Sequence, residues 1–393
     1  MNTVEKGKNP TLTYALVQGF FWMNIAAGVG FVSVYLLELG FSNTQIGILI
    51  AVAGALTAIL QPVVASYADR PSSPSIKKIM LVICVIVVGM TILLLLNAGY
   101  NFTTGLLYGG DMVLLQLMIP LVNSLGMESI NQGKKLNFGM ARGVGSLCYA
   151  VTAYGLGLLA ADFGAKVIPF SIIIILAGLI LLLNLFPFRK GKEKKETAKN
   201  SGGLIYFFKR YRMFCFTLCG CVLIYVSHLL INSFAFQIVQ SKGGGSSEMG
   251  FILALAAVLE LPTMFLFTWM LKKAKADVWL RISGIFYMIK TLSTLLAPTI
   301  TVLYFVQAFQ MFGFALYTVS SVYYVNSIME EQDAIKGQAY MTMTNSLGSV
   351  LGALIGGWLL DAAGTTAMLV FATAAAAVGM TIVLLTVGRG TER

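Results

Sequence analysis

The sequence predicts an all-α polytopic membrane protein, with twelve transmembrane helices arranged as two pseudo-symmetric bundles of six. Three observations lead to this fold class. First, 58% of the residues are hydrophobic and only 11% are charged, which leaves too little polar surface for a protein that is surrounded by water. Second, apolar runs of about 20 residues, the length of a membrane-spanning helix, recur along the whole chain. Third, the longest charged stretch lies between the sixth and seventh of these runs.

The spans follow one another with short loops, apart from that one charged stretch. The first apolar run is too long for the core of a signal peptide, so we expect it to be the first span. We expect an N-terminal six-helix bundle at 1–188, a basic cytoplasmic linker at 189–212 and a C-terminal six-helix bundle at 213–393. The predicted spans are 12–38, 44–67, 78–98, 102–126, 139–161, 166–187, 213–239, 249–271, 279–297, 299–326, 338–360 and 366–387.

The orientation follows from the basic residues. Lysine and arginine lie almost entirely in the two tails, in the linker and in alternate loops, whereas the remaining loops carry only Lys166 and Lys242. By the positive-inside rule, both termini are cytoplasmic, and we expect the cell (plasma or inner) membrane. The net charge of +11 is therefore a signal of topology and gives no reason to expect nucleic acid. The linker is expected to lie against anionic lipid headgroups.

Spans 5 and 11 resemble each other. Each has Gly-Ser near the predicted cytoplasmic end, small residues at intervals of four, and an aspartate at the far end, Asp162 or Asp361. Small residues let membrane helices approach closely. Parallel six-span repeats are typical of transporters, in which the substrate site lies between the halves near the midplane of the membrane.

Five ionisable residues fall inside predicted spans, and they are the first candidates for function. Arg142 lies about 10 Å into the membrane at a rise of 1.5 Å per residue, where an arginine costs roughly 2.5–3.5 kcal/mol. It either extends back to the interface or faces a central cavity, where an acid such as Glu260 or the substrate offsets its charge. Glu260 lies too deep to reach either surface, so a coupling role for protons or substrate is favoured over a structural pair. Asp111 and Lys290 are either functional or a structural pair, and His228 is expected to be a hydrogen-bonded helix contact.

The first span also concentrates aromatic residues. Phe20, Phe21 and Trp22 are candidates to line a sugar or aromatic-ring site, with Asn24 as a hydrogen-bonding group, and an interior packing stripe is an equal alternative. No cluster of His, Cys and acidic residues has the spacing of a metal site, so no metal or cofactor is expected.

Three stretches resemble the major facilitator superfamily, and within it the lactose permease-like proton symporters and the related phenylpropionate-permease-like branch. GILIAVAGALTAILQPVVASYADR resembles the family's second span and the following loop, NFGMARGVGSLCY the start of its fifth span, and LELPTMFLF its eighth. The resemblance extends over nearly the whole chain and implies the major facilitator fold.

The resemblance also implies roles. Arg142 matches the family's sugar-binding arginine of span 5, and Tyr149 stands where a tryptophan stacks on the sugar ring. Glu260 matches the span-8 glutamate that links sugar binding to protonation. Lys290 stands where the permease has a span-9 arginine, which keeps the charge but loses the two-pronged geometry of a guanidinium.

Other positions depart from the permease pattern. The span-4 sugar-binding glutamate is replaced around Asn123 and Ser124, and the span-10 histidine corresponds by spacing to Gln310. The permease's proton-carrying glutamate corresponds to Gly313. Proton coupling would therefore require Glu260 or Asp111.

The loop after span 2 resembles the family's conformational-switch motif. Since such loops contact neighbouring helix ends, the resemblance implies a gating role. The residues concerned are Asp69, Arg70, Lys77 and Lys78.

The leading hypothesis is a secondary active transporter that moves a small polar solute, a sugar or a nucleoside-like molecule, by proton symport with alternating access. The alternatives are an importer of aromatic or other organic acids and a drug or metabolite exporter. From a different class, a non-transporting membrane sensor is also considered. Nothing supports an enzyme, because no nucleophile–base pair and no P-loop is present. The expected partners are the solute, protons or sodium, and the lipid bilayer, with the chain as a monomer.

Overall fold

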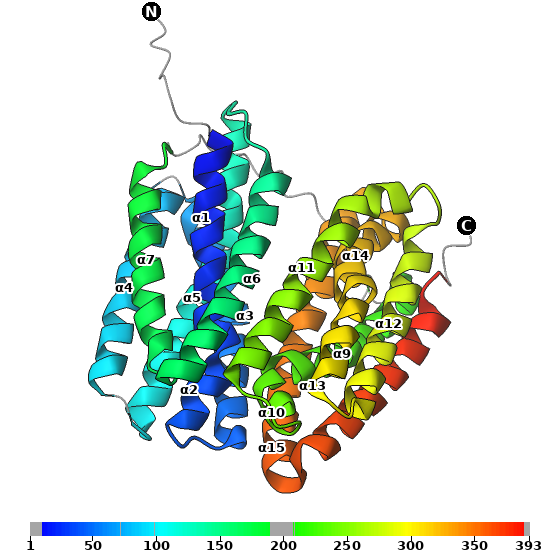
Figure 1. The fold of residues 1–393 in the computed structure, drawn as a ribbon. Helices are drawn as coiled ribbons and strands as arrows, with labels where there is room; N and C mark the ends of the chain where they lie inside the picture. Colours follow the sequence, from blue (N-terminus) through cyan, green and yellow to red (C-terminus); the bar gives the residue numbers. More distant parts are fainter. Residues whose placement is uncertain (1–9, 71, 98, 189–206, 208, 389–393) are drawn as a thin grey trace, which may run out of the picture. The chain divides into compact units, whose positions relative to one another are not determined.

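In a lipid environment the backbone must form its hydrogen bonds internally, and a chain of such apolar runs does so as helices. The computed structural model describes residues 10–388 except 71, 98, 189–206 and 208, and within them only helices, turns and loops occur (Figure 1). Most of the predicted basic linker lies outside the described residues.

The described helices form two compact units, which are treated separately. The first unit comprises Met1–Gly40 and Leu56–Lys195, and the second comprises Phe41–Ala55 and Glu196–Arg393. Helix α3 therefore contributes its beginning to the second unit and its end to the first. The elements assigned by sequence to the first six spans are α1 (Pro10–Ile25), η1 (Ala26–Gly30), α2 (Val32–Glu38), α3 (Asn43–Asp69), α4 (Ile76–Leu96), α5 (Phe102–Asn131), α6 (Phe138–Phe163) and α7 (Val167–Leu185).

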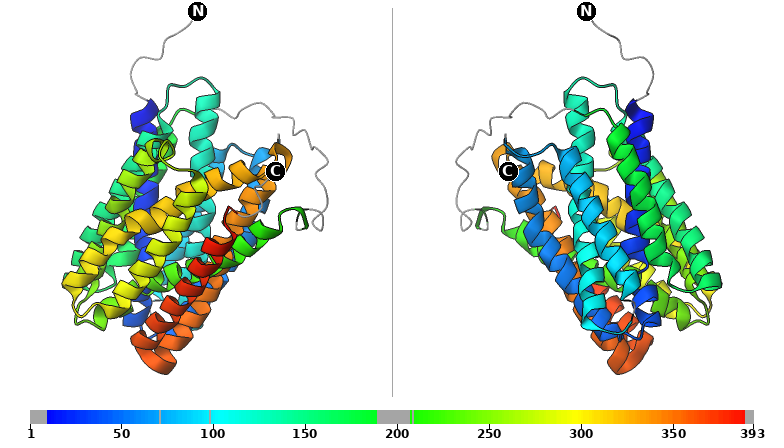
Figure 2. Two further views of the ribbon diagram at one scale, coloured as in Figure 1. Left: turned by 90° about the vertical axis from the view of Figure 1, so that its right-hand side faces the viewer. Right: turned by 90° about the vertical axis from the view of Figure 1, so that its left-hand side faces the viewer.

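The second unit contains the remaining helices. They are α9 (Arg212–Ser233), α10 (Ala235–Gln240), α11 (Ser246–Met270), α12 (Ala276–Leu296), α13 (Ile300–Val306), η2 (Gln307–Gln310), η3 (Met311–Ala315), α14 (Leu316–Ile328) and α15 (Glu331–Thr386). The two halves of α15, orange and red in Figure 2, meet at a reversal of the chain.

The twelve predicted spans correspond to these helices, although α5 extends five residues beyond span 4 and α15 begins seven residues before span 11. Ten described stretches are long and apolar enough to cross a membrane. The longest, Lys336–Thr386, contains two predicted spans, because α15 breaks at Gly364. The remaining predicted span is α12, a helix of 21 residues that carries three charged side chains. The predicted all-α fold class is confirmed.

The repeat of spans 5 and 11 extends to the backbone. Gly164 has φ 79° and ψ 173° after α6, and Gly364 has φ 78° and ψ 179° inside α15. Both combine a positive φ with a ψ near 180°, a conformation that is essentially restricted to glycine. The fifth span of each half thus turns into the sixth through the same glycine conformation.

The first half of α3 belongs to the second unit because its backbone packs directly on α15. A Cβ at Gly47 would lie 2.3 Å from the carbonyl oxygen of Ala353, and a Cβ at Gly357 would lie 2.4 Å from that of Asn43. The Asp361 carboxylate accepts hydrogen bonds from the backbone N–H groups of Asn43 (3.1 Å) and Thr44 (2.7 Å). These donors have no partner within their own helix, and an acid near a helix N-terminus is favourable.

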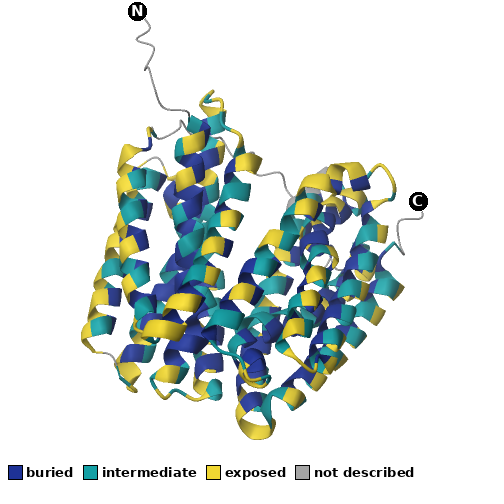
Figure 3. Ribbon diagram, viewed as in Figure 1, coloured by how far each residue is buried: buried dark blue, intermediate teal, exposed yellow. Residues whose placement is uncertain are grey.

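Apolar side chains are also exposed along the helices of both units, as expected for lipid-facing surfaces. Figure 3 shows exposed residues at intervals along the length of helices such as α4 and α7. Val82 and Val85 on α4 and Ile174 on α7 are each more than half exposed. Several polar residues are buried within the units, and the candidate site residues Asp111, Lys290 and Gln310 are among them.

Candidate functional site

In the second unit, three predicted residues form one hydrogen-bonded cluster. Lys290 on α12 donates from Nζ to Gln310 Oε1 at 2.5 Å, and Gln310 Nε2 donates to Glu260 Oε1 at 2.8 Å. Lys290 and Gln310 are buried, at 2% and 3% exposure. The amide fits between a cation and an anion in this orientation only, since its oxygen must face the ammonium and its nitrogen the carboxylate.

Irregular helix geometry places Gln310 in this cluster. Gln310 ends the 3₁₀ segment η2, and the π-helical segment η3 follows it. Both segments change the helical register locally, and π-turns recur at functional sites. The hydroxyl of Thr263 on α11 donates to the carbonyl oxygen of Met311 at 2.9 Å, which satisfies a backbone group at the irregularity.

Glu260 lies on α11 two residues before Pro262, which interrupts the backbone hydrogen bonds of that helix. Its side chain is half-buried, whereas Lys290 is almost fully enclosed. Glu260 is therefore the more accessible charge of the cluster. A solute with hydroxyl or amide groups would find in Glu260 a strong acceptor that is held at the centre of a membrane helix.

His228 packs among aromatic rings. Its ring stacks on Phe314 with centroids 4.6 Å apart and 2° between the planes, and it meets Tyr287 edge-on at 5.5 Å. Asn232 Nδ2 lies 3.1 Å from His228 Nδ1 and donates to the His228 carbonyl oxygen at 2.8 Å. His228 is thus held both by ring contacts with other helices and by a residue of its own helix, α9.

In the first unit, Arg142 on α6 lies over Trp22 on α1, with its Cζ 3.9 Å from the ring centroid. The guanidinium also donates to Ser146 Oγ at 2.9 Å. A cation on a tryptophan face is stabilised by about 0.5–2 kcal/mol, the larger value applying when water is excluded. The aromatic face thus offsets part of the cost of placing Arg142 in the membrane.

A chain of hydrogen bonds supports Trp22. Trp22 Nε1 donates to Gln18 Oε1 at 3.0 Å, and Gln18 Nε2 donates to Tyr14 Oη at 2.7 Å and contacts Asn123 Oδ1 at 3.4 Å. Tyr14, Gln18 and Trp22 are four residues apart and share one face of α1. Tyr14 and Gln18 are not among the residues predicted from the sequence, although their four-residue spacing from Trp22 places them on its face of the helix.

Two further candidates of the first unit are Tyr149 and Asn24. Tyr149 is half-buried on the same side of α6 as Arg142, seven residues further on. Asn24 is fully buried, and its amide donates to Phe20 of its own helix. The structure thus brings Trp22, Asn123 and Arg142 into one neighbourhood and leaves Asn24 outside it.

The two predicted acid–base pairings, Arg142 with Glu260 and Asp111 with Lys290, each join residues of different units. Within the units, Asp111 is paired with Thr91, and Lys290 with Gln310.

In the predicted gating loop, Lys77 makes the clearest contact. Its ammonium donates to the carbonyl oxygens of Asn184 and Phe186, both at 3.0 Å, at the end of α7. These carbonyls lack partners within the helix, and a cation there complements the helix dipole. Arg70 and Lys78 are exposed, and the side chain of Asp69 lies outside the described residues.

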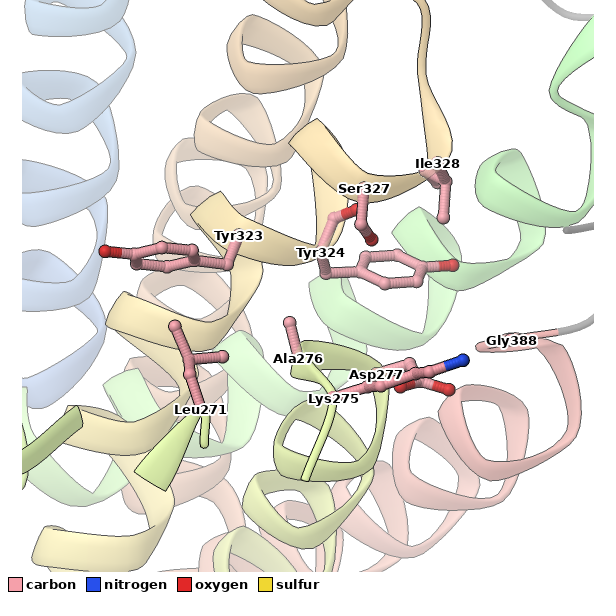
Figure 4. A pocket seen from close by; sticks show the side chains of 9 residues that line it. All are labelled: Leu271, Lys275, Ala276, Asp277, Tyr323, Tyr324, Ser327, Ile328 and Gly388. Carbon is pink, nitrogen blue, oxygen red and sulfur yellow. The ribbon is translucent and has the colours of Figure 1, made fainter. Parts of the chain in front are cut away.

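A separate cavity of about 420 Å³ lies at the ends of α11, α12, α14 and α15 in the second unit (Figure 4). It contains none of the predicted site residues. Its lining is Leu271, Lys275, Ala276, Asp277, Tyr323, Tyr324, Ser327, Ile328 and Gly388.

Comparison with known proteins now identifies the family. The model of the MFS_1 like family matches residues 12–372. No curated protein matches the chain. The structure is similar to that of a point mutant of the nucleoside transporter NupG, with TM-score 0.82 at 15% identity, covering 96% of this chain and 99% of the other.

Two further solved structures share the fold. A point mutant of the peptide transporter POT has TM-score 0.75 at 11% identity, covering 99% of this chain and 97% of the other. A bacterial homologue of the human lysosomal transporter Spinster has TM-score 0.67 at 16% identity, covering 97% of each chain. With the family model matched over most of its length, the chain belongs to the MFS_1 like family and is a multi-pass membrane transporter of the major facilitator superfamily.

Proposed function

We propose that this transporter moves a small polar solute, a sugar or a nucleoside-like molecule, across the cell membrane by proton symport. The observation that supports this most is the hydrogen-bonded series Lys290–Gln310–Glu260. Charged groups inside a membrane protein are costly and are kept mainly where they bind a solute or an ion. The name of NupG, a nucleoside transporter, agrees with the nucleoside-like alternative.

Both units offer groups that suit such a solute. Arg142 and Trp22 offer a cation on an aromatic face, and Tyr149 offers a second ring. Glu260, Gln310 and Lys290 offer an acceptor, an amide and a donor. Such groups suit hydroxyls and a ring, whether of a sugar or of a nucleobase. Glu260 and Asp111 are the acids available for proton coupling.

The test is uptake into vesicles that contain the purified protein, with an imposed proton gradient. The panel comprises nucleosides, monosaccharides and disaccharides, aromatic carboxylic acids and dipeptides. We expect accumulation of one neutral class, lost when a protonophore dissipates the gradient and lost in Glu260→Gln. Glu248→Gln is the matched control, because Glu248 lies on the same helix and accepts a hydrogen bond from Gly245 that a glutamine oxygen can also accept.

Other outcomes decide between the alternatives. Accumulation of an aromatic acid alone would replace the neutral solute by an anionic one. Gradient-driven loss of solute from preloaded vesicles would indicate an exporter. Binding of a solute without any flux would favour the non-transporting sensor.

A further inference from the structure

A buried acid lies in the first unit, far along the sequence from the half-buried Glu260. Asp111 on α5 is 2% exposed. Its Oδ2 lies 2.9 Å from the hydroxyl oxygen of Thr91 on α4. Gly110 leaves room on α5 for the Met90 side chain of α4, because a Cβ at Gly110 would lie 2.4 Å from Met90 Cε.

Only one protein hydrogen atom, the hydroxyl proton of Thr91, is shown within reach of the Asp111 carboxyl in the described part of the chain. Thr91 Oγ1 lies 2.8 Å from the carbonyl oxygen of Val87 and 2.9 Å from Asp111 Oδ2, and a hydroxyl has a single proton to donate. If Asp111 were ionised, it would compete with the Val87 carbonyl for that one proton. If Asp111 carries a proton, it donates to Thr91, which in turn donates to Val87, and both bonds are satisfied at once.

The environment of the second carboxyl oxygen also favours a protonated Asp111. Within the described part of the chain, Asp111 Oδ1 is buried and has no hydrogen-bond partner. The same holds for the hydroxyls of Tyr108 and Tyr35, whose rings stack with centroids 5.3 Å apart. Without a hydrogen bond, the carbonyl oxygen of a neutral carboxylic acid is far less costly to bury than an oxygen of a charged carboxylate.

No cation on the described helices packed against this site offsets a charge on Asp111. Helices α1 and α7 and segment η1 carry no charged residue, and α5 carries only Asp111 and Glu128. Helix α3, which is bonded to α5 through Gln61, has no basic residue. On α4 the basic residues are Lys77 and Lys78, the nearer one 13 residues before Thr91, or about 20 Å along the helix. The remaining nearby charge, Glu38 beyond Tyr35 on α2, is itself acidic.

We infer that Asp111 carries a proton on Oδ2 in this conformation and is the proton-binding site of the transporter. The inference rests on the proposed function and deepens it, since it separates the proton on Asp111 from the solute-binding acid Glu260. Binding forms the O–H bond on Oδ2, and release returns the proton to water. Because Asp111 is enclosed, release requires α4 and α5 to separate around Thr91.

The protonation state is tested directly by infrared difference spectroscopy on the purified full-length protein at neutral pH, with no solute present. A protonated carboxyl shows a C=O stretch that a carboxylate lacks. We expect this band to disappear in Asp111→Asn and to shift in Thr91→Val, which removes the acceptor. Asp162→Asn, a change at an exposed acid of α6, leaves the band unchanged. A carboxylate band that disappears in Asp111→Asn overturns the inference.

Transport supplies a second test that separates this inference from the proposed function. Asparagine resembles the protonated acid, so Asp111→Asn should fold as stably as the wild type. It should retain exchange of labelled for unlabelled solute and lose accumulation driven by a proton gradient at least ten-fold. Gradient-driven accumulation that survives in Asp111→Asn refutes the site while leaving symport intact. If wild type transports no solute of the panel, the proposed function fails, and the infrared result still decides the state of Asp111.

Discussion

Gln310 is a neutral residue that hydrogen-bonds two charged side chains. Its amide is the shared partner of Lys290 and Glu260, and both contacts lie in a largely buried part of α11, α12 and η2. A hydrogen bond to a charged group contributes about 1.5–3 kcal/mol, and more is lost when the charge is left buried. Glu260 and Lys290 could be predicted as site residues because they are charged residues inside apolar spans. Gln310 is neutral and could be predicted only from its position relative to the permease pattern.

Gln310→Leu is therefore expected to reduce solute uptake at least ten-fold, because the substitution keeps the size of the side chain and removes both hydrogen bonds. The matched control is Gln307→Leu, a glutamine equally buried whose amide donates to Leu303 of its own helix. Initial uptake rates in vesicles, corrected for the amount of folded protein, measure the effect. Equal losses in the two variants would show that Gln310 acts only through packing.

Gly145, three residues after Arg142 on α6, leaves space for the Trp22 ring that Arg142 contacts. A Cβ at this position would lie 2.7 Å from Trp22 Cδ1 and 3.4 Å from the carbonyl oxygen of Gln18. Glycine therefore allows α1 and α6 to approach so closely that the tryptophan face meets the guanidinium. The sequence showed a glycine-rich helix, and only the structure shows which glycine the contact requires.

Gly145→Ala is expected to displace Trp22 and to cost about 1–3 kcal/mol in strain. The variant should melt at a lower temperature and bind solute more weakly. Gly155→Ala on the same helix is the control, since its Cβ would meet nothing within 4 Å. The prediction is wrong if the two variants have the same Tm and the same solute affinity.

At the scale of elements, hydropathy predicted where the helices lie, because the membrane requires long apolar runs and tolerates little else. It could not predict the irregular turns η1, η2 and η3, and it gave no sign that Thr263 of α11 would bond to the Met311 carbonyl oxygen in η3. It also could not show that the first half of α3 packs in the second unit. That contact depends on glycines at matching levels of two helices distant in the sequence.

Contact between α3 and α15 should be sensitive to a single methyl group at Gly47. A Cβ there would lie 2.3 Å from the Ala353 carbonyl oxygen, which is a rigid backbone atom, so Gly47→Ala must separate the helices. We expect a lower Tm and faster hydrogen exchange at the start of α3. Gly54→Ala, whose Cβ would make an ordinary 3.9 Å contact with Val350, should change neither. Unchanged exchange in Gly47→Ala would contradict a close contact in the membrane.

At the scale of the whole molecule, contacts at the start of α9 connect the described end of the linker to α15. The Tyr211 hydroxyl donates to Asp333 Oδ2 at 3.2 Å and accepts from the backbone N–H of Glu330, and Arg210 forms an ion pair with Glu330. Burial raises the pKa of Tyr211, so the hydroxyl keeps its proton and can donate. The composition of the chain could suggest a linker here, but not that its last residues are part of the second unit.

Proton symport requires that solute and protons cross the membrane together, and a recording of external pH tests this directly. De-energised cells that contain the protein, in weakly buffered medium, receive a pulse of the solute while the external pH is recorded. We expect transient alkalinisation with wild type and none with Glu260→Gln at equal surface expression. Uptake of the solute by wild type with no change in external pH would contradict proton symport.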